Sequence, residues 1–287
     1  SIDVLRGIVM IIMALDHTRE FFHMGAYTAD PLDLATTTPI LYFTRWITHF
    51  CAPIFVFLSG TSIYLQSLRK TPQELRTFLL KRGLWLIFIE LVVMSFCFTL
   101  NPFFNVLILQ VIWCIGITMV VMSVLLRIPF KFILALGLVI VLGHNLLDIP
   151  EAAEGFKANF WWMLLHRTGA YPFDEGRILY ILYPFLPWMG LMLLGYCSGV
   201  FFSPNYSREQ RGRVLVRLGL GAVLLFVVLR FVNIYGNPAP WSAQKNTVLT
   251  VLSFLNVNKY PPSLLFMCMT IGPAFLMLAW LERVNNG

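Results

Sequence analysis

Long apolar segments recur from one end of the chain to the other, and they indicate its class. A helix needs about 20 apolar residues to cross a bilayer, and 58% of the 287 residues are hydrophobic while only 12% are charged. The pattern predicts an all-α, polytopic transmembrane helix bundle with about eight transmembrane helices. The expected spans are 2–23, 47–66, 79–100, 104–126, 130–147, 178–202, 213–234 and 262–281.

One further apolar stretch, residues 247–255, is too short to cross a bilayer and predicts a short interfacial or re-entrant helix. The chain shows no internal repeat, low-complexity tract or soluble domain, so we expect a single integral-membrane domain over residues 1–287. Because the sequence opens without Met and stops at Gly287, we expect it to be a fragment that lacks its true ends.

The basic residues gather in short loops between apolar runs. The formal net charge is +7, and Lys and Arg in such loops set membrane orientation and contact lipid, so no nucleic-acid partner is expected. If the first helix runs outward, the basic loops near 69–82, 127–131 and 208–217 are cytoplasmic, and the longer loops 24–46 and 148–177 lie outside. The five cysteines show no CxxC spacing, so neither a disulfide framework nor a metal site is expected.

The first helix ends in a group of ionisable residues: Asp16, His17, Arg19, Glu20 and His23. A charge near the bilayer centre costs about 2.5 to 3.5 kcal/mol, so such residues usually face a bundle interior or a water-filled cavity. Alternatively, the helix has already reached the headgroups and the group is simply solvated. His17 suits a general base near neutral pH, with Asp16 or Glu20 to orient it.

Four stretches in a fixed order resemble a known family. They are residues 2–7 (IDVLRG) followed by Asp16-His17, residues 52–62 (APIFVFLSGTS), residues 183–190 (YPFLPWMG) and residues 259–264 (KYPPSL). Together they resemble the transmembrane acyltransferase superfamily, and within it the heparan-alpha-glucosaminide N-acetyltransferase family and its bacterial branch. The resemblance covers nearly the whole chain.

This resemblance implies a membrane acetyltransferase that moves an acetyl group from cytoplasmic acetyl-CoA to an amine or hydroxyl of a sugar or glycan on the other side. It also implies a multi-pass protein of a bacterial inner membrane and favours a homodimer. The family's functional residue in the first helix falls ten positions after the Arg-Gly pair, at His17. The heparan enzyme has Asn there and uses a His in the following loop, so His23 stays an alternative base, and an acetyl-histidine intermediate stays open.

The remaining site residues follow from charge, shape and the motifs. Phosphates of acetyl-CoA call for Arg or Lys at a cytoplasmic mouth, and hydroxyl or imidazole donors on the second helix suit an oxyanion. Each group has a competing explanation. The basic residues can be ordinary positive-inside charge, the hydroxyls can bond to their own backbone, and the tryptophans can form an aromatic belt at the membrane interface. The expected cofactor-binding residues are Arg6, Arg69, Arg82, Ser59 and Lys259. The expected substrate-binding residues are Arg19, His49, Trp162 and Trp188, beside the catalytic set Asp16, His17, Glu20 and His23.

Two other functions use the same residues. In a proton-coupled transporter or flippase, Asp16, His17, Glu20 and Glu90 would form a proton relay, although no paired, broken helices occur in matching halves. A glycan-export partner would keep the bundle without acyl transfer. Glu90, inside an otherwise apolar run, is expected to pair with Arg6 or Arg82 or to line a cavity.

Overall fold

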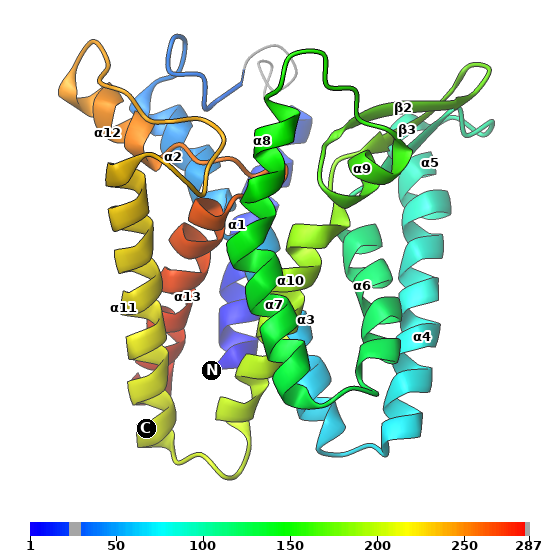
Figure 1. Cartoon of the computed structure of the whole chain (residues 1–287), viewed down its shortest axis with the longest axis vertical. Coiled ribbons are helices and arrows are strands. Elements are labelled where there is room, and N and C mark those ends of the chain that lie inside the picture. The colour runs from blue at the N-terminus through cyan, green and yellow to red at the C-terminus, as the bar shows by residue number, and fades with distance from the viewer. Residues whose placement is uncertain (23–29, 285–287) are drawn as a thin grey trace. The chain divides into compact units, whose positions relative to one another are not determined.

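A computed structural model describes residues 1–22 and 30–284. Within these residues six helical segments are long and apolar enough to cross a membrane, and the chain is a helical, multi-pass membrane protein, as the sequence predicts (Figure 1). The segments are Pro39–Ser67, Pro72–Thr99, Phe130–Glu151, Phe185–Phe202, Arg208–Val232 and Leu264–Val284.

Two of the eight expected spans differ from this set. The first is a single helix, α1 (Ile2–Phe22), but it carries too many charged residues to count among the six apolar segments. The span expected at 104–126 is divided into a strand, β1 (Val106–Leu109), and a helix of only 15 residues, α6 (Val111–Leu125). Because an apolar run alone does not separate a buried strand from a helix, the sequence pattern missed this division.

The chain forms two compact units. The first unit combines residues 1–55, 205–259 and 263–287 and contains α1, α2 (Pro39–Thr48), α11 (Arg208–Val232), α12 (Thr247–Leu255) and α13 (Leu264–Val284). Gly219 lets α11 approach α13, because a Cβ there would lie 2.9 Å from the Gly272 carbonyl oxygen. Glu282 then accepts from Arg211 at 2.6 Å and from the Ser1 hydroxyl, which joins the starts of α1 and α11 to the end of α13.

A buried arginine fixes the chain after α11 in the same unit. Arg230 is 2% exposed, and its guanidinium donates to the carbonyl oxygens of Ser253, Phe254 and Asn256 at the end of α12. The last carbonyls of a helix lack the usual intrahelical partners, and here the Ser253 carbonyl also accepts the Asn256 N–H at 3.3 Å. The short helix predicted at 247–255 is confirmed as α12. Arg230 holds its C-terminal end, which lies four residues before Lys259. The predicted position of this helix at a membrane interface stays a prediction.

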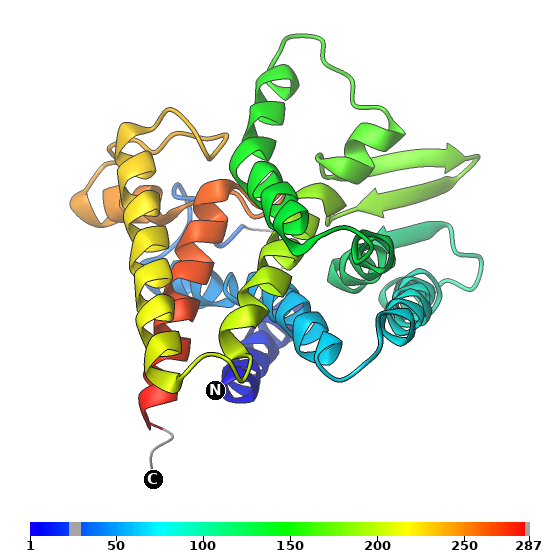
Figure 2. The same ribbon diagram turned by 60° about the horizontal axis from the view of Figure 1, so that its bottom comes forward.

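The second unit, residues 56–204 and 260–262, holds the other long helices. They are most of α3 (Cys51–Ser67), α4 (Pro72–Phe88) with its continuations η1 (Ile89–Met94) and α5 (Ser95–Thr99), α6, α7 (Phe130–Gly143) and α10 (Phe185–Ser198), which η3 (Gly199–Phe202) continues. Helices α4 and α6 run side by side in both ribbon views (Figures 1 and 2). Gly83 and Gly116 face each other there, and a Cβ on either would meet the other's carbonyl oxygen at 2.6 or 2.8 Å.

Glu90, in the π-helical segment η1, has a backbone partner where an arginine was expected. Its carboxylate accepts the Trp113 backbone N–H at 2.9 Å and faces the first turn of α6. Glu90 is 1% exposed and makes no salt bridge to any residue of the described part of the chain. A helix N-terminus presents unpaired N–H groups and partial positive charge, which satisfies a buried carboxylate without a side-chain cation.

A three-stranded sheet, which the sequence pattern did not predict, lies at one end of this unit's helices. β2 (Gly169–Asp174) and β3 (Arg177–Ile181) form a hairpin that turns at Gly176, whose φ is +70°, and β1 pairs parallel to β3 to give the order β1-β3-β2. The segment between α7 and the sheet contains η2 (His144–Leu147), α8 (Asp148–Glu151) and α9 (Phe160–Leu165). The expected loop 148–177 is thus largely ordered structure.

The contact between α3 and α10 gives a test of close packing. Gly60 lies against the backbone of α10, and an added Cβ would overlap the Met192 carbonyl oxygen. Backbone cannot yield as a side chain can, so we expect Gly60→Ala to lower the free energy of unfolding by about 2 kcal/mol. In the control Gly221→Ala on α11, the new Cβ has no atom within 4 Å, so we expect no decrease in the free energy of unfolding. Thermal midpoints in one detergent compare the two; equal midpoints would contradict the close contact.

Candidate functional site

The charged end of α1 presents its residues on two sides of the helix. Asp16 and Arg19, three residues apart, are largely buried, with 14% and 13% of their side chains exposed. His17 and Glu20 are also three apart, but 49% and 43% of their side chains are exposed, and His17 Nδ1 lies 3.3 Å from Glu20 Oε2. At 100° per residue Glu20 lies between Asp16 and His17 around the helix. The described part of the predicted group therefore divides into a buried pair and an exposed pair.

Asp16 joins α1 to α2 through a two-arginine contact. Arg45 Nη1 donates to both carboxylate oxygens of Asp16, at 2.7 and 2.6 Å, and Arg19 Nη2 donates to Oδ1 at 3.1 Å. All three side chains are about 14% exposed. A partly buried carboxylate with two charge-assisted partners is strongly held in its ionised form.

Local sequence signals place Arg45 at this point. Helix α2 begins with Pro39 after the N-cap Thr38, whose hydroxyl accepts from the Leu41 N–H. The helix ends at Thr48, and α3 starts at Cys51, with Pro53 in its first turn, where no N–H is required. His49 is thereby placed at the corner between the two helices.

The ring of His49 is enclosed beside the arginines. It is 2% exposed, packs edge-on against Phe266 with ring centroids 5.4 Å apart, and lies within electrostatic range of Asp16 and the cations Arg19, Arg45 and Lys259. One carboxylate and three cations therefore act electrostatically on this imidazole. We define Asp16, Arg19, Arg45, His49 and Lys259 as the Asp16 cluster.

Three buried polar atoms in and beside the Asp16 cluster have no hydrogen-bond partner among residues 1–22 and 30–284. They are Arg19 Nε, Trp46 Nε1 and His49 Nδ1. Buried polar groups in folded proteins are nearly always paired, and an exception needs an explanation. Two of these atoms are donors and the third is an imidazole nitrogen, so each can bind an acceptor such as a carbonyl oxygen.

Lys259 enters the cluster from the segment before α13. It is 9% exposed and acts electrostatically on both Asp16 and His49. The helix start expected after Pro261-Pro262 is confirmed: α13 begins at Leu264, and the Ser263 hydroxyl accepts the Phe266 N–H at 3.1 Å. The KYPPSL motif thus ends a loop with a buried cation and begins a helix.

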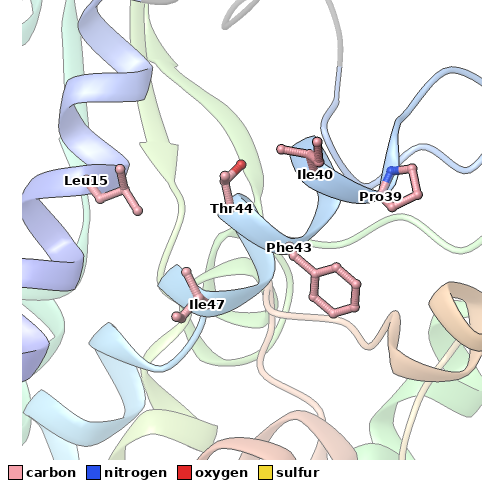
Figure 3. A pocket seen from close by; sticks show the side chains of 6 residues that line it. All are labelled: Leu15, Pro39, Ile40, Phe43, Thr44 and Ile47. Atoms are coloured by element: carbon pink, nitrogen blue, oxygen red, sulfur yellow. The ribbon is translucent and has the colours of Figure 1, made fainter.

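A shallow apolar groove lies between α1 and α2 near the cluster. Figure 3 shows Leu15 of α1 across from Ile40, Thr44 and Ile47 of α2, and the hollow measures about 450 Å³ (Figure 3). A second hollow of about 560 Å³ shares Leu15 and Thr44 and reaches Arg19. An apolar path therefore leads along the two helices to a member of the Asp16 cluster.

Of the predicted site residues, Asp16, Arg19, His49 and Lys259 come together in the Asp16 cluster. His17 and Glu20 adjoin it on the exposed side of α1, and His23 lies outside the described residues. Arg6 pairs with Asp3 at 3.0 Å near the other end of α1, ten residues from Asp16.

The remaining predicted residues lie in the second unit. Arg69 and Arg82 are exposed, and Ser59 is half-buried on α3. Trp162 donates from Nε1 to Glu151 at 2.6 Å, and Trp188 is fully buried, with its ring centroid 5.0 Å from that of Tyr183. The roles expected for these residues stay predictions.

Sequence reasoning missed Arg45 and Trp46. Both lie in a stretch that the hydropathy pattern assigned partly to an outer loop, although Arg45 and His49 are four residues apart, which is one helical turn. A search for basic residues one turn before the second expected helix would have found Arg45.

The fold and the Asp16 cluster define a multi-pass helical membrane protein with a buried, cation-rich polar site. Comparison with known families identifies it further: the family model described as heparan-alpha-glucosaminide N-acetyltransferase, catalytic, matches residues 1–235. The chain belongs to this family, as the sequence motifs predict. No curated protein matches the chain.

The ion pair at Asp16 gives a stability prediction. Asp16→Asn removes the negative charge that two hydrogen bonds from the partly buried Arg45 hold in place, and we expect a loss of about 3 kcal/mol in the free energy of unfolding. The matched control is Asp3→Asn, which removes an exposed pair with Arg6 and should cost less than about 1 kcal/mol. Denaturation of both variants in the same detergent tests this prediction. Equal free energies of unfolding would show that the contact between Asp16 and Arg45 does not stabilise the fold more than the exposed pair does.

Proposed function

We propose that the protein is an acetyl-CoA-dependent membrane acetyltransferase that acetylates an amine or hydroxyl of a sugar or glycan. Residues 1–287 would act as one acyltransferase domain in a bacterial inner membrane, with a homodimer as the favoured assembly. The family membership supports the reaction class. The single structural observation that carries the proposal is the Asp16 cluster, in and beside which three buried nitrogen atoms have no hydrogen-bond partner among the described residues.

The cluster fits the electrostatic demand of acyl transfer. Attack on the thioester places negative charge on the carbonyl oxygen, and preorganised donors in a low-dielectric site stabilise that oxyanion. Arg19 Nε and Trp46 Nε1 are buried donors without a partner among the described residues, and Lys259 adds positive charge. Asp16 would hold the two arginines in position, and His49 would contribute a hydrogen bond from its ring.

The base in this proposal is His17. Its Nδ1 faces Glu20 at 3.3 Å, which fixes the ring and leaves Nε2 to take the acceptor's proton. Glu20 stabilises the imidazolium that results. An acceptor lying along the side of α1 between Asp16 and His17 would then meet the base and the oxyanion donors together, which suits direct transfer in one ternary complex.

The donor would reach the cluster from the basic end of the first unit. Arg6 lies ten residues before Asp16, or about 15 Å along α1 at 1.5 Å per residue, a distance that suits an extended pantetheine arm. Arg213 and Arg217, one turn apart on α11, line a hollow of about 330 Å³. This hollow lies near the start of α1, because Ser1 and Arg211 of α11 both bind Glu282. Arg6, Arg213 and Arg217 are the first unit's candidates for the phosphates. Arg69 and Arg82, predicted for the same role, belong to the second unit and stay separate candidates.

A direct assay tests the reaction class. Purified protein in detergent, given radiolabelled acetyl-CoA and a panel of amino sugars and glycans, should transfer label to at least one acceptor. Label retained on the protein in single turnover without an acceptor would support an acetyl-histidine route instead of direct transfer. The proposal is wrong if the protein neither binds acetyl-CoA, nor hydrolyses it, nor transfers its acetyl group. The transporter and export-partner hypotheses would then be the ones to test.

The base assignment gives a kinetic prediction. We expect His17→Gln to lower kcat by about 10² to 10⁴ while leaving acetyl-CoA binding unchanged, because the ring is half-exposed and acts only in proton transfer. Met10→Leu is the control on the same helix, since Met10 is exposed and lines neither hollow beside the Asp16 cluster, and its kcat should match that of the wild type. If His17→Gln keeps full kcat while His49→Gln loses it, the base is His49.

A further inference from the structure

A second buried polar group lies in the other unit, where α7 continues through η2 and α8 to α9. Glu151 Oε1 accepts from Trp162 Nε1 at 2.6 Å and lies 2.9 Å from His166 Nδ1. His166 Nε2 in turn lies 3.2 Å from His144 Nδ1. His166 and His144 are 0% and 3% exposed. The cluster has no part in the proposed acetyl transfer.

Hydrogen-bond roles fix the protons in this chain of contacts. An ionised Glu151 is an acceptor only, so His166 Nδ1 carries a proton and His166 Nε2 accepts. His144 Nδ1 is then the donor, and His144 Nε2 holds a lone pair. This last nitrogen is buried and has no partner in the described part of the chain. The two rings can therefore reverse the bond between them, and the His166–Glu151 hydrogen bond is the one that the reversal gives up.

We propose that Asp148, Glu151 and His166 form a binding site for a divalent metal ion of the zinc type. One ligand atom from each residue lies within 4.8 Å of the others. Among residues 1–22 and 30–284, Asp148 Oδ1 and Glu151 Oε2 accept no hydrogen bond, since Asn145 and Trp162 bind the other oxygen of each carboxylate. One imidazole and two carboxylates are a ligand set that Zn²⁺ accepts, with a fourth position left for water.

The distances need only a small adjustment. Ligand atoms on a tetrahedral zinc ion lie about 3.4 Å apart, given bonds of about 2.0 to 2.1 Å. The His166 Nδ1 to Glu151 separation of 2.9 Å opens slightly when the ion replaces the shared proton. Asp148 and Glu151 are partly exposed, Glu151 with 15% of its side chain, so small rotations can close the wider separations and let an ion enter from solvent.

The histidine pair supplies the outer contact that such a site needs. Metal-bound His usually donates its other ring N–H to a neighbouring acceptor, which orients the ring. When His166 Nδ1 binds the ion, its proton can move to Nε2 and be donated to His144 Nδ1. His144 then carries its own proton on Nε2, where nothing in the described part of the chain opposes it. His144 is a positioning residue for the ion and not a ligand.

Titration of the full chain with Zn²⁺ tests the site. Protein freed of metal by a chelator and held in detergent should bind one Zn²⁺ by calorimetry, and elemental analysis should find one ion per chain. We expect Asp148→Asn and Glu151→Gln each to weaken binding by more than about 100-fold, and His144→Phe to weaken it about tenfold. Glu151→Gln retains an oxygen for Trp162 and His166, so its folding should be preserved.

Glu154→Gln is the matched control, because Glu154 is an exposed acid in the same segment, and it should bind Zn²⁺ as the wild type does. Zn²⁺ should also raise the thermal midpoint of the wild type and of Glu154→Gln, but not that of Glu151→Gln. A wild-type protein that binds no Zn²⁺, or that binds it equally well after Asp148→Asn and Glu151→Gln, would overturn the site. The outcome is independent of acetyl transfer.

Discussion

The bond between Asp16 and Arg45 is the contact on which the polar interior of the first unit depends. It ties α1 to α2 by two short hydrogen bonds from one nitrogen, and it keeps a carboxylate and a guanidinium where neither is well solvated. With Arg45 held, His49 is enclosed one turn later, and Lys259 reaches the same place from the segment that Arg230 anchors. A single ion pair thus brings three distant parts of the sequence to one site.

The apolar environment predicts helices well because backbone groups must be satisfied within each segment. Six expected spans therefore correspond to long helices, and the helix start after Pro261-Pro262 followed from proline geometry. The sheet did not follow, because β1 lies in the same apolar run as α6 and its partner strand β3 is about 70 residues away. Pairing at that separation leaves no periodic signal in a single sequence.

The candidate site was only partly predictable for a related reason. The sequence shows that charges gather at the end of α1, but it does not show which side of the helix meets α2, so it could not separate Asp16 from His17. Glu90 illustrates the same limit, because its partner is a helix N-terminus and hydropathy reveals only side chains. Arg45 was hidden because the helix that carries it begins earlier than the apolar run suggested.

Spare hydrogen-bonding capacity separates structural charges from candidate sites in this protein. Glu90 and Glu282 are buried acids whose hydrogen bonds hold a helix end or tie helices together. The Asp16 cluster and the His144–His166 pair instead retain buried nitrogen atoms without a partner among the described residues. A buried polar atom without a partner costs free energy, so an apolar group of the same shape would give a more stable fold. In these two groups the atoms lie beside carboxylates and other ionisable side chains, and this combination is the physical reason to expect ligands at both.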